Sequence, residues 1–156
     1  MAPTRNLEIH NMAGHLIRRL NQISTSVFQD RMRLEGYDLT PIQFAAMNAI
    51  HANPGIDQAS LAGLIAHDRA TIGGVVDRLE AKGIVLRKIS ARDRRARELS
   101  LTEAGAVILE AATPVVRAMQ DDMLTGLSLS ERQEFLRLAR KAADNGNDLS
   151  RAPLMR

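Results

Sequence analysis

The chain has 156 residues, of which 45% are hydrophobic and 25% charged, a composition typical of a soluble globular protein with one domain-sized core. It contains no cysteine, which excludes disulfides, thiolate catalysis and cysteine-based redox sensing. No signal peptide and no bilayer-spanning apolar run is visible, so we expect a cytoplasmic protein without a membrane partner.

Positive charge is concentrated in one region of a chain whose net charge is only +3. Residues 68–97 hold nine basic and four acidic side chains, a local net charge of +5, so the other 126 residues carry −2. The nine basic residues are Arg69, Arg78, Lys82, Arg87, Lys88, Arg92, Arg94, Arg95 and Arg97. Such a clustered field indicates a polyanionic partner, with nucleic acid favoured over a membrane.

The first predicted element is a long helix from about Asn6 to Leu34. Its apolar residues recur at three- and four-residue steps as a narrow seam: Ile9, Met12, Leu16, Leu20, Ile23 and Val27. A seam this narrow favours pairing with a second helix, and we expect a contact between two copies of the chain. Packing within one subunit is the alternative.

A second helix is predicted after Thr40, which can form a capping box with Gln43 while Pro41 occupies the first turn. Asn53-Pro54-Gly55 should end it. A short helix within residues 57–68 follows, with Leu61, Leu64 and Ile65 expected to point inward.

Asp68 is predicted to cap the next helix, which Gly83 should end. The apolar residues of this helix share one face: Ile72, Val75, Val76 and Leu79.

Beyond Gly83 the apolar period changes to two residues, which predicts a β-hairpin whose polar loop is residues 90–97. Helix is predicted again from Thr102 to about Thr125, broken or bent near Pro114. A last helix is expected to begin at Ser130, where Ser130 and Gln133 could form a capping box.

Two short helices followed by a basic hairpin predict a mainly α fold with a small β-hairpin wing, a winged helix-turn-helix. The second helix of such a pair lies in the major groove of DNA, and the hairpin can reach the adjacent minor groove or backbone. The other interpretation of the charged run, a solvated surface loop, is less consistent with its place directly after a recognition-type helix.

The stretch from Leu61 to Gly105 resembles the MarR family of bacterial transcriptional regulators. The matching pieces, in order, are Val76-Asp77-Arg78-Leu79-Glu80, Lys82-Gly83-Ile84-Val85, Arg87, Asp93-x-Arg95 and Leu101-Thr102-x-x-Gly105. The resemblance implies dimerisation helices over residues 1–35 and 102–145 and a DNA-binding lobe over residues 36–101. We expect residues 146–156 to form a flexible tail.

The resemblance also implies roles for residues in the wing. Arg95 is expected in the minor groove, with Asp93 holding the loop and orienting that arginine. Arg92, Arg94 and Arg97 are either phosphate contacts or solvated charges.

In the recognition helix, Asp68, Arg69, Ala70 and Thr71 form the part expected to reach base edges. Arg78 either contacts the DNA backbone or pairs with Asp77 or Glu80. The glycines at 73 and 74 depart from many family members, and either close approach of Gly74 to DNA or tight packing would explain them.

Many members of the family respond to small phenolic or aromatic carboxylates. On the first helix Arg19 lies at the edge of the apolar face and His15 is one turn away, a pair suited to binding a carboxylate. An interhelical salt bridge, with the Arg19 stem covering apolar surface, is the alternative.

The sequence carries no metal-binding spacing among its four histidines, no phosphate-binding glycine loop and no nucleophile motif. We therefore expect no catalysis, no metal and no cofactor. The predicted protein is a homodimer that binds double-stranded DNA, most simply as a repressor released by a small aromatic acid. A winged-helix module that binds another protein is the alternative function.

Overall fold

The computed structural model describes residues 7–155, and the predicted class, mainly helical with a β wing, is confirmed. The helices are the 3-10 helix η1 (Glu8–Asn11), α1 (Ala13–Leu34), α2 (Pro41–Ala52), α3 (Gln58–Leu64), α4 (Arg69–Ala81), α5 (Glu103–Met123), α6 (Leu129–Asn145) and the 3-10 helix η2 (Asn147–Leu149). The strands are β1 (Ile56–Asp57), β2 (Val85–Ile89) and β3 (Arg97–Leu101).

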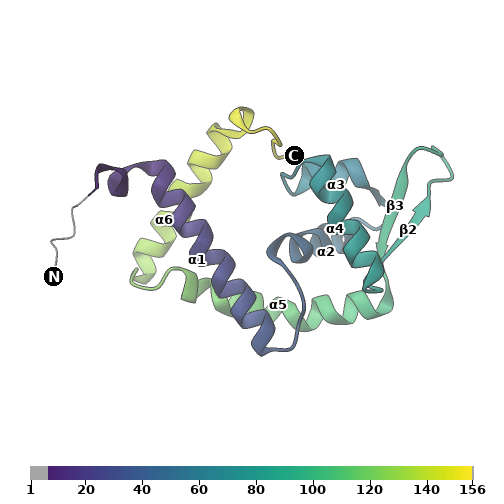
Figure 1. Ribbon diagram of the computed structural model, residues 1–156, viewed down its shortest axis with the longest axis horizontal. Coiled ribbons are helices and arrows are strands. Elements are labelled where there is room, and N and C mark those ends of the chain that lie inside the picture. Colours follow the sequence, from purple (N-terminus) through teal and green to yellow (C-terminus); the bar gives the residue numbers. More distant parts are fainter. Residues whose placement is uncertain (1–6, 156) are drawn as a thin grey trace.

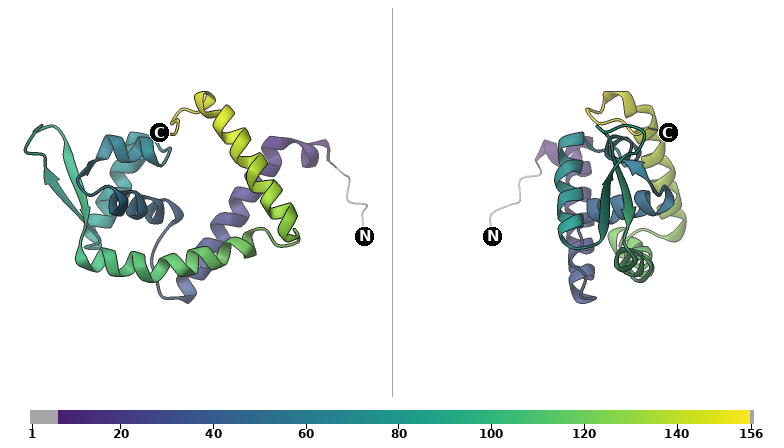
Figure 2. Two further views of the ribbon diagram at one scale, coloured as in Figure 1. Left: turned by 180° about the vertical axis from the view of Figure 1, so that it is seen from behind. Right: turned by 90° about the vertical axis from the view of Figure 1, so that its right-hand side faces the viewer.

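The molecule has two ends joined by α5 (Figure 1). Helices α2, α3 and α4 and the β2–β3 hairpin form a lobe at one end, whereas α1 and α6 lie at the other. Seen from behind, α5 runs from the base of the lobe toward α6, and the hairpin projects beyond the helices as a wing (Figure 2). The predicted domain limits follow the same division but remain a prediction.

The hydrophobic core lies mainly in the lobe. Ile50, Leu61, Ile72, Leu79 and Leu99 are all 0% exposed, so α2, α3, α4 and β3 meet there. Burial of each such side chain contributes about 1.5–3 kcal/mol to folding. The core therefore fixes the inner face of α4 and leaves its outer face to solvent.

The predicted helix starts at Thr40 and Asp68 are confirmed. The Thr40 hydroxyl accepts from the Gln43 N–H at 3.3 Å, and the Gln43 side chain accepts from the Thr40 N–H at 3.2 Å. Gly83, with φ of +69°, follows the end of α4 as predicted, because glycine adopts the left-handed region without strain.

The predicted start of the last helix was wrong by two residues. The cap is Ser128, whose hydroxyl accepts from the Glu131 N–H at 3.3 Å, while the Glu131 carboxylate accepts from the Ser128 N–H at 2.8 Å. A carboxylate in the first turn also interacts favourably with the positive end of the helix dipole, which favours this box over the one at Ser130 and Gln133.

The first helix differs from its predicted extent, and the fifth, whose predicted limits agree within two residues, is not broken at its proline. Met12 has extended backbone, which separates η1 from α1, so the long helix begins at Ala13; Asn6 lies outside the described residues. Helix α5 continues through Pro114 to Met123 instead of breaking. The carbonyl that loses its N–H partner belongs to the exposed Glu110, where water can hydrate it.

The sheet has a third strand that the sequence did not reveal. Its order is β1-β3-β2, with both pairs antiparallel and Ile56 opposite Leu99. A strand of two residues is too short to show a period. The hairpin pairs Val85 with Leu101 and Ile89 with Arg97, so Arg97 lies in β3 and not in the loop.

Two local packing details bear on the lobe. Leu64 is 39% exposed, contrary to the inward orientation expected, because α3 ends there and the chain turns at Ala66, where φ is +55°. At Gly105 a Cβ atom would collide with the Ile84 carbonyl oxygen, so only glycine lets α5 begin this close to the strand.

The chain returns to the lobe at its C-terminal end (Figure 1). The Met155 N–H donates to the Gly63 carbonyl at 2.9 Å, and the Asn147 side chain bonds both main-chain groups of Leu154. The flexibility expected of residues 146–156 stays a prediction. Within residues 7–155, no helix combines the length and apolar character needed to cross a membrane.

Candidate nucleic-acid interface

The wing loop is held by hydrogen bonds from two polar side chains. Ser90 Oγ accepts from the N–H groups of Arg92 and Asp93 at 3.2 and 3.4 Å. Asp93 Oδ1 accepts from the Arg95 N–H at 2.9 Å, and the Asp93 carbonyl accepts from the Ala96 N–H at 3.0 Å. Asp93 thus holds the loop through the main chain of Arg95, without an ion pair to its guanidinium.

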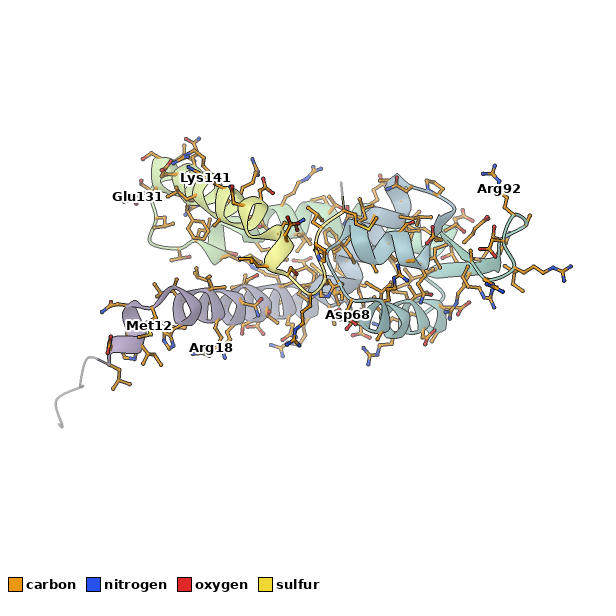
Figure 3. The ribbon with its side chains drawn as sticks, turned by 90° about the horizontal axis from the view of Figure 1, so that it is seen from above. Met12, Arg18, Asp68, Arg92, Glu131 and Lys141 are labelled. Carbon is orange, nitrogen blue, oxygen red and sulfur yellow. The ribbon has the colours of Figure 1, made fainter. Side chains whose placement is uncertain are left out.

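The charged groups of the wing tip are free to reach a ligand. Arg92, Arg94 and Arg95 are exposed, and their guanidinium groups make no hydrogen bond or ion pair within residues 7–155. Figure 3 shows Arg92 at the tip of the wing, beyond the helices of the lobe. Arg97 differs, because its guanidinium donates to the Arg94 carbonyl at 3.1 Å and so takes part in the loop.

The start of α4 is closed by Asp68. Its carboxylate accepts from the Thr71 N–H at 2.8 Å and from the Thr71 hydroxyl at 2.6 Å. The hydroxyl bond, followed by the N–H bond, lowers the pKa of Asp68 below its ordinary value. The Thr71 hydroxyl proton is engaged in this cap, which leaves the Arg69 guanidinium as the free side-chain donor of the first turn.

The two glycines of α4 have different surroundings. A Cβ at Gly73 would lie 3.4 Å from Gln58 Nε2, an ordinary packing contact, whereas one at Gly74 would meet nothing within 4 Å. Gly74 lies about 200° around the helix from the buried Ile72, on the outer face. Packing within the protein therefore does not require glycine at position 74.

Arg87 of β2 occupies the two acids that were the alternative partners of Arg78. Its Nη2 lies 2.6 Å from both Asp77 Oδ1 and Glu80 Oε2. Arg78 has no hydrogen-bond or ion-pair partner in the described part of the chain. The physical reason is that side chains one or two residues apart on a helix do not face each other.

A hollow on the lobe surface joins the wing to the start of α4. Three arginines, Arg69, Arg95 and Arg97, line it together with the acids Asp57 and Asp93. The sequence argument placed Arg69 on the helix and the other two on the wing, and the structure brings them together.

Two further residues of this region were not identified from the sequence. Gln58 lines the same hollow and also lies below Gly73 and beside Arg87. Asp57 caps α3 by accepting from the Ser60 N–H at 2.9 Å, and an Asp-x-x-Ser pattern was the available signal for it.

The candidate effector residues lie on the other end of the molecule. His15 Nδ1 is 3.5 Å from Arg18 Nη2, and the rings of His10 and His15 are 5.5 Å apart. Arg18 points away from α6 (Figure 3), and Arg19 has no hydrogen-bond or ion-pair partner within residues 7–155. Desolvation and the charge of Arg18 lower the pKa of His15, so arginine is the cationic group here at neutral pH.

The described residues contain no cluster of three or more His, Cys, Asp or Glu side chains that could hold a metal ion. The hollow between the wing and α4 instead presents the guanidinium groups of Arg69, Arg95 and Arg97. Unpaired arginines on a helix and an adjacent hairpin can bind phosphates and base edges of a duplex.

Comparison with known proteins agrees with this geometry. A sequence profile of the MarR family matches residues 37–96. The transcriptional regulator HosA of Escherichia coli O127:H6 is 35% identical over 135 residues, which cover 86% of this chain and 97% of HosA. The HTH-type transcriptional repressor NicR of Pseudomonas putida is 35% identical over 138 residues, covering 88% of this chain and 86% of NicR.

Solved structures give the same result. PcaV of Streptomyces coelicolor, in complex with its natural ligand, has a TM-score of 0.80 at 29% identity, with 88% of this chain and 96% of PcaV covered. BpsR of Bordetella bronchiseptica, whose DNA binding is regulated by 6-hydroxynicotinic acid, has a TM-score of 0.80 at 28% identity, with coverages of 88% and 97%.

The repressor CouR, bound to a 23-mer DNA duplex, has a TM-score of 0.78 at 28% identity and coverages of 87% and 95%. The chain therefore belongs to the MarR family and is a DNA-binding transcriptional regulator of the winged-helix type.

Proposed function

We propose that this protein is a homodimeric repressor that binds a pseudo-palindromic operator and leaves it when a small aromatic carboxylate binds. The observation that carries the DNA part is the hollow in which Arg69 of α4 meets Arg95 and Arg97 of the wing. With Arg69 in the major groove, Arg95 on the same surface would reach the adjacent minor groove. The protein acts by binding and not by catalysis.

The homodimer is supported by apolar surface at the α1–α6 end. Met12, just before α1, and Leu16 and Ile23 of α1 are 50%, 42% and 43% exposed, and α6 contains no buried residue. Contiguous exposed apolar side chains of this kind mark an interface. A second copy would cover them and present two recognition helices to half-sites about 10 base pairs apart.

An aromatic carboxylate effector is supported by the relatives and by the cations of α1. BpsR is regulated by 6-hydroxynicotinic acid, and PcaV was solved with its natural ligand. In this chain the unpaired Arg19, with His15 nearby on α1, can bind the anionic end of such a molecule. Binding would change the spacing between the two lobes and prevent simultaneous contact with both half-sites.

A hollow between α2 and α5 is a second candidate binding site for the same effector. It is lined by Asn48 and His51 of α2 and by Arg117 of α5, among others. A ligand bound in this hollow would contact both α2 of the lobe and α5, and could therefore change the orientation of the lobe relative to α5 directly. Arg19 and Arg117 are therefore separate candidates for the carboxylate partner.

Selection of bound sequences from random duplex DNA, followed by a screen of aromatic acids for release, tests this function. We expect a two-fold symmetric site, release by an aromatic acid, and loss of release in Arg19→Ala with DNA affinity retained. If Arg117→Ala loses release and Arg19→Ala does not, the effector lies between α2 and α5. Arg33→Ala, which removes an exposed cation near the other end of α1, is the control.

A salt titration separates DNA binding from the alternative, a protein-binding module. Log affinity for the selected duplex should fall linearly with log salt as counterions are released from phosphates. Absence of duplex binding at low salt would contradict the proposed function and favour a protein partner.

A further inference from the structure

Arg87 of β2 links three elements of the lobe through one side chain. Its guanidinium bonds Asp77 and Glu80 of α4, and its Nη1 lies 3.5 Å from Gln58 Oε1 of α3. We propose that Arg87 is a positioning residue, which fixes the wing against the recognition helix so that Arg95 and α4 reach one duplex together. This inference rests on the DNA-binding function and concerns a residue that was not among those expected to contact DNA.

The place of Arg87 along β2 suits this role. The strand starts in the core at Val85, which is 2% exposed, and ends free at Ile89, which is 62% exposed. Arg87 lies between them, where the hairpin leaves the core. Strand β2 pairs only with β3, and β1 pairs with β3 no farther than Glu98, opposite Lys88, so the hairpin beyond Lys88 is two-stranded and has little stability of its own.

The geometry of the contact requires arginine. The Arg87 side chain is 23% exposed, and two nitrogens of its planar group contact Glu80 Oε2 while Nη2 also contacts Asp77. A lysine ammonium carries the same charge but lacks the planar fork that spans both acids and Gln58. Glu80, followed by Asp77, raises the pKa of Arg87, because both carboxylates favour the charged guanidinium.

The ion pair also lies close to solvent, since the side chains of Asp77 and Glu80 are 64% and 40% exposed. Pairs this exposed add little to global stability. The expected consequence of losing Arg87 is therefore a misplaced wing on a folded lobe. A direct phosphate contact by Arg87 is the competing role, and it would depend on charge alone.

Hydrogen exchange in the free protein tests the wing directly and needs no DNA. In Arg87→Lys we expect the wing amides of Ser90 and Ala96 to exchange about fivefold faster, with core amides of α2 unchanged. Lys88→Gln, which removes the adjacent cation of the same strand, should leave wing exchange as in the wild type. Unchanged wing exchange in Arg87→Lys would overturn the proposal, whatever the protein binds.

A double-mutant cycle on the selected operator tests the consequence for binding. Arg87→Lys should weaken operator affinity by about tenfold although the charge is retained. In the Arg87→Lys background, Arg95→Ala should weaken affinity by only about twofold or less. Wild-type operator affinity in Arg87→Lys would also overturn the proposal. So would a double variant whose loss of affinity equals the product of the two single losses, because the two residues would then act independently. Failure of the wild type to bind any duplex would instead contradict the proposed function, and the exchange result would still decide the role of Arg87.

Discussion

The lobe and the α1–α6 end of the molecule differ in how completely one chain buries its apolar side chains. In the lobe, Ile50, Ile72 and Leu99 are 0% exposed. At the other end, α6 contains no fully buried residue and α1 contributes only Phe28 and Met32 to the buried core. The lobe is complete within one chain, whereas the helical end leaves an apolar surface that a second chain can cover.

This difference indicates a division of roles. A lobe with its own core can hold α4 and the wing in fixed geometry before DNA is bound. A helical end completed by a second copy can set the spacing of two such lobes. The following changes test that division.

The largest expected effect comes from a charge placed on the exposed seam of α1. Leu16→Glu should convert the dimer to a monomer, because burial of an unpaired carboxylate opposes association. Operator affinity should fall by about a hundredfold or more as bivalent binding is lost. Sedimentation and DNA titration measure both. Val107→Glu, at an α5 side chain that is 61% exposed, is the control and should keep the dimer mass.

A large-to-small change in the lobe core should destabilise the fold itself. Leu99→Ala should lower the free energy of unfolding by about 2–5 kcal/mol, because it opens a cavity at a fully buried site. Urea denaturation measures this loss. Leu136→Ala on α6, at a 53% exposed position, should instead weaken dimerisation. An equal loss of lobe stability in both variants would mean that the two ends share one core.

On α4, stability and DNA binding should respond in opposite directions to one methyl group. Gly74→Ala should stabilise the helix by about 0.5–1 kcal/mol, since a Cβ there meets no atom of the protein within 4 Å. Operator affinity should fall if the outer face of α4 approaches DNA closely, because the added Cβ would then occupy that space. Gly73→Ala is the matched control beside Gln58. Gly74→Ala that binds the operator as tightly as the wild type would show that close approach is not required.

The smallest expected effect is a pH dependence within the lobe. The Ser60 hydroxyl, followed by the Ser60 N–H, lowers the pKa of Asp57, so ionised Asp57 stabilises the folded state. Because the folded pKa is depressed, this stabilisation is full above the ordinary pKa of about 3.9 and is lost as the pH falls through the folded value. Asp57→Asn should therefore be less stable than the wild type at pH 7, and the difference should vanish in acid. If the stability difference between Asp57→Asn and the wild type were the same at every pH, it would come from hydrogen bonding alone and not from the charge of Asp57.

Elements with strong local signals were predicted well. The capping box at Thr40, the cap at Asp68 and the glycine stop at Gly83 each depend on a few adjacent residues, and all three are confirmed. The hairpin was also found, because an apolar period of two differs clearly from that of a helix.

Features that depend on tertiary contacts were not predictable. Strand β1 exists only because residues 56–57 pair with β3, and α5 passes Pro114 without a break. The link from Arg87 to α4 joins residues seven and ten positions apart, on different elements. The candidate DNA-binding residues came from the motif, whereas the convergence of Arg69 and Arg95 on one hollow required the fold.

The most direct test of the account is the affinity of Arg95→Ala for the selected operator at physiological ionic strength. If the wing and α4 form one DNA-binding surface, this change should weaken binding by about tenfold or more while the protein stays folded and dimeric. Wild-type affinity in Arg95→Ala would contradict that central claim.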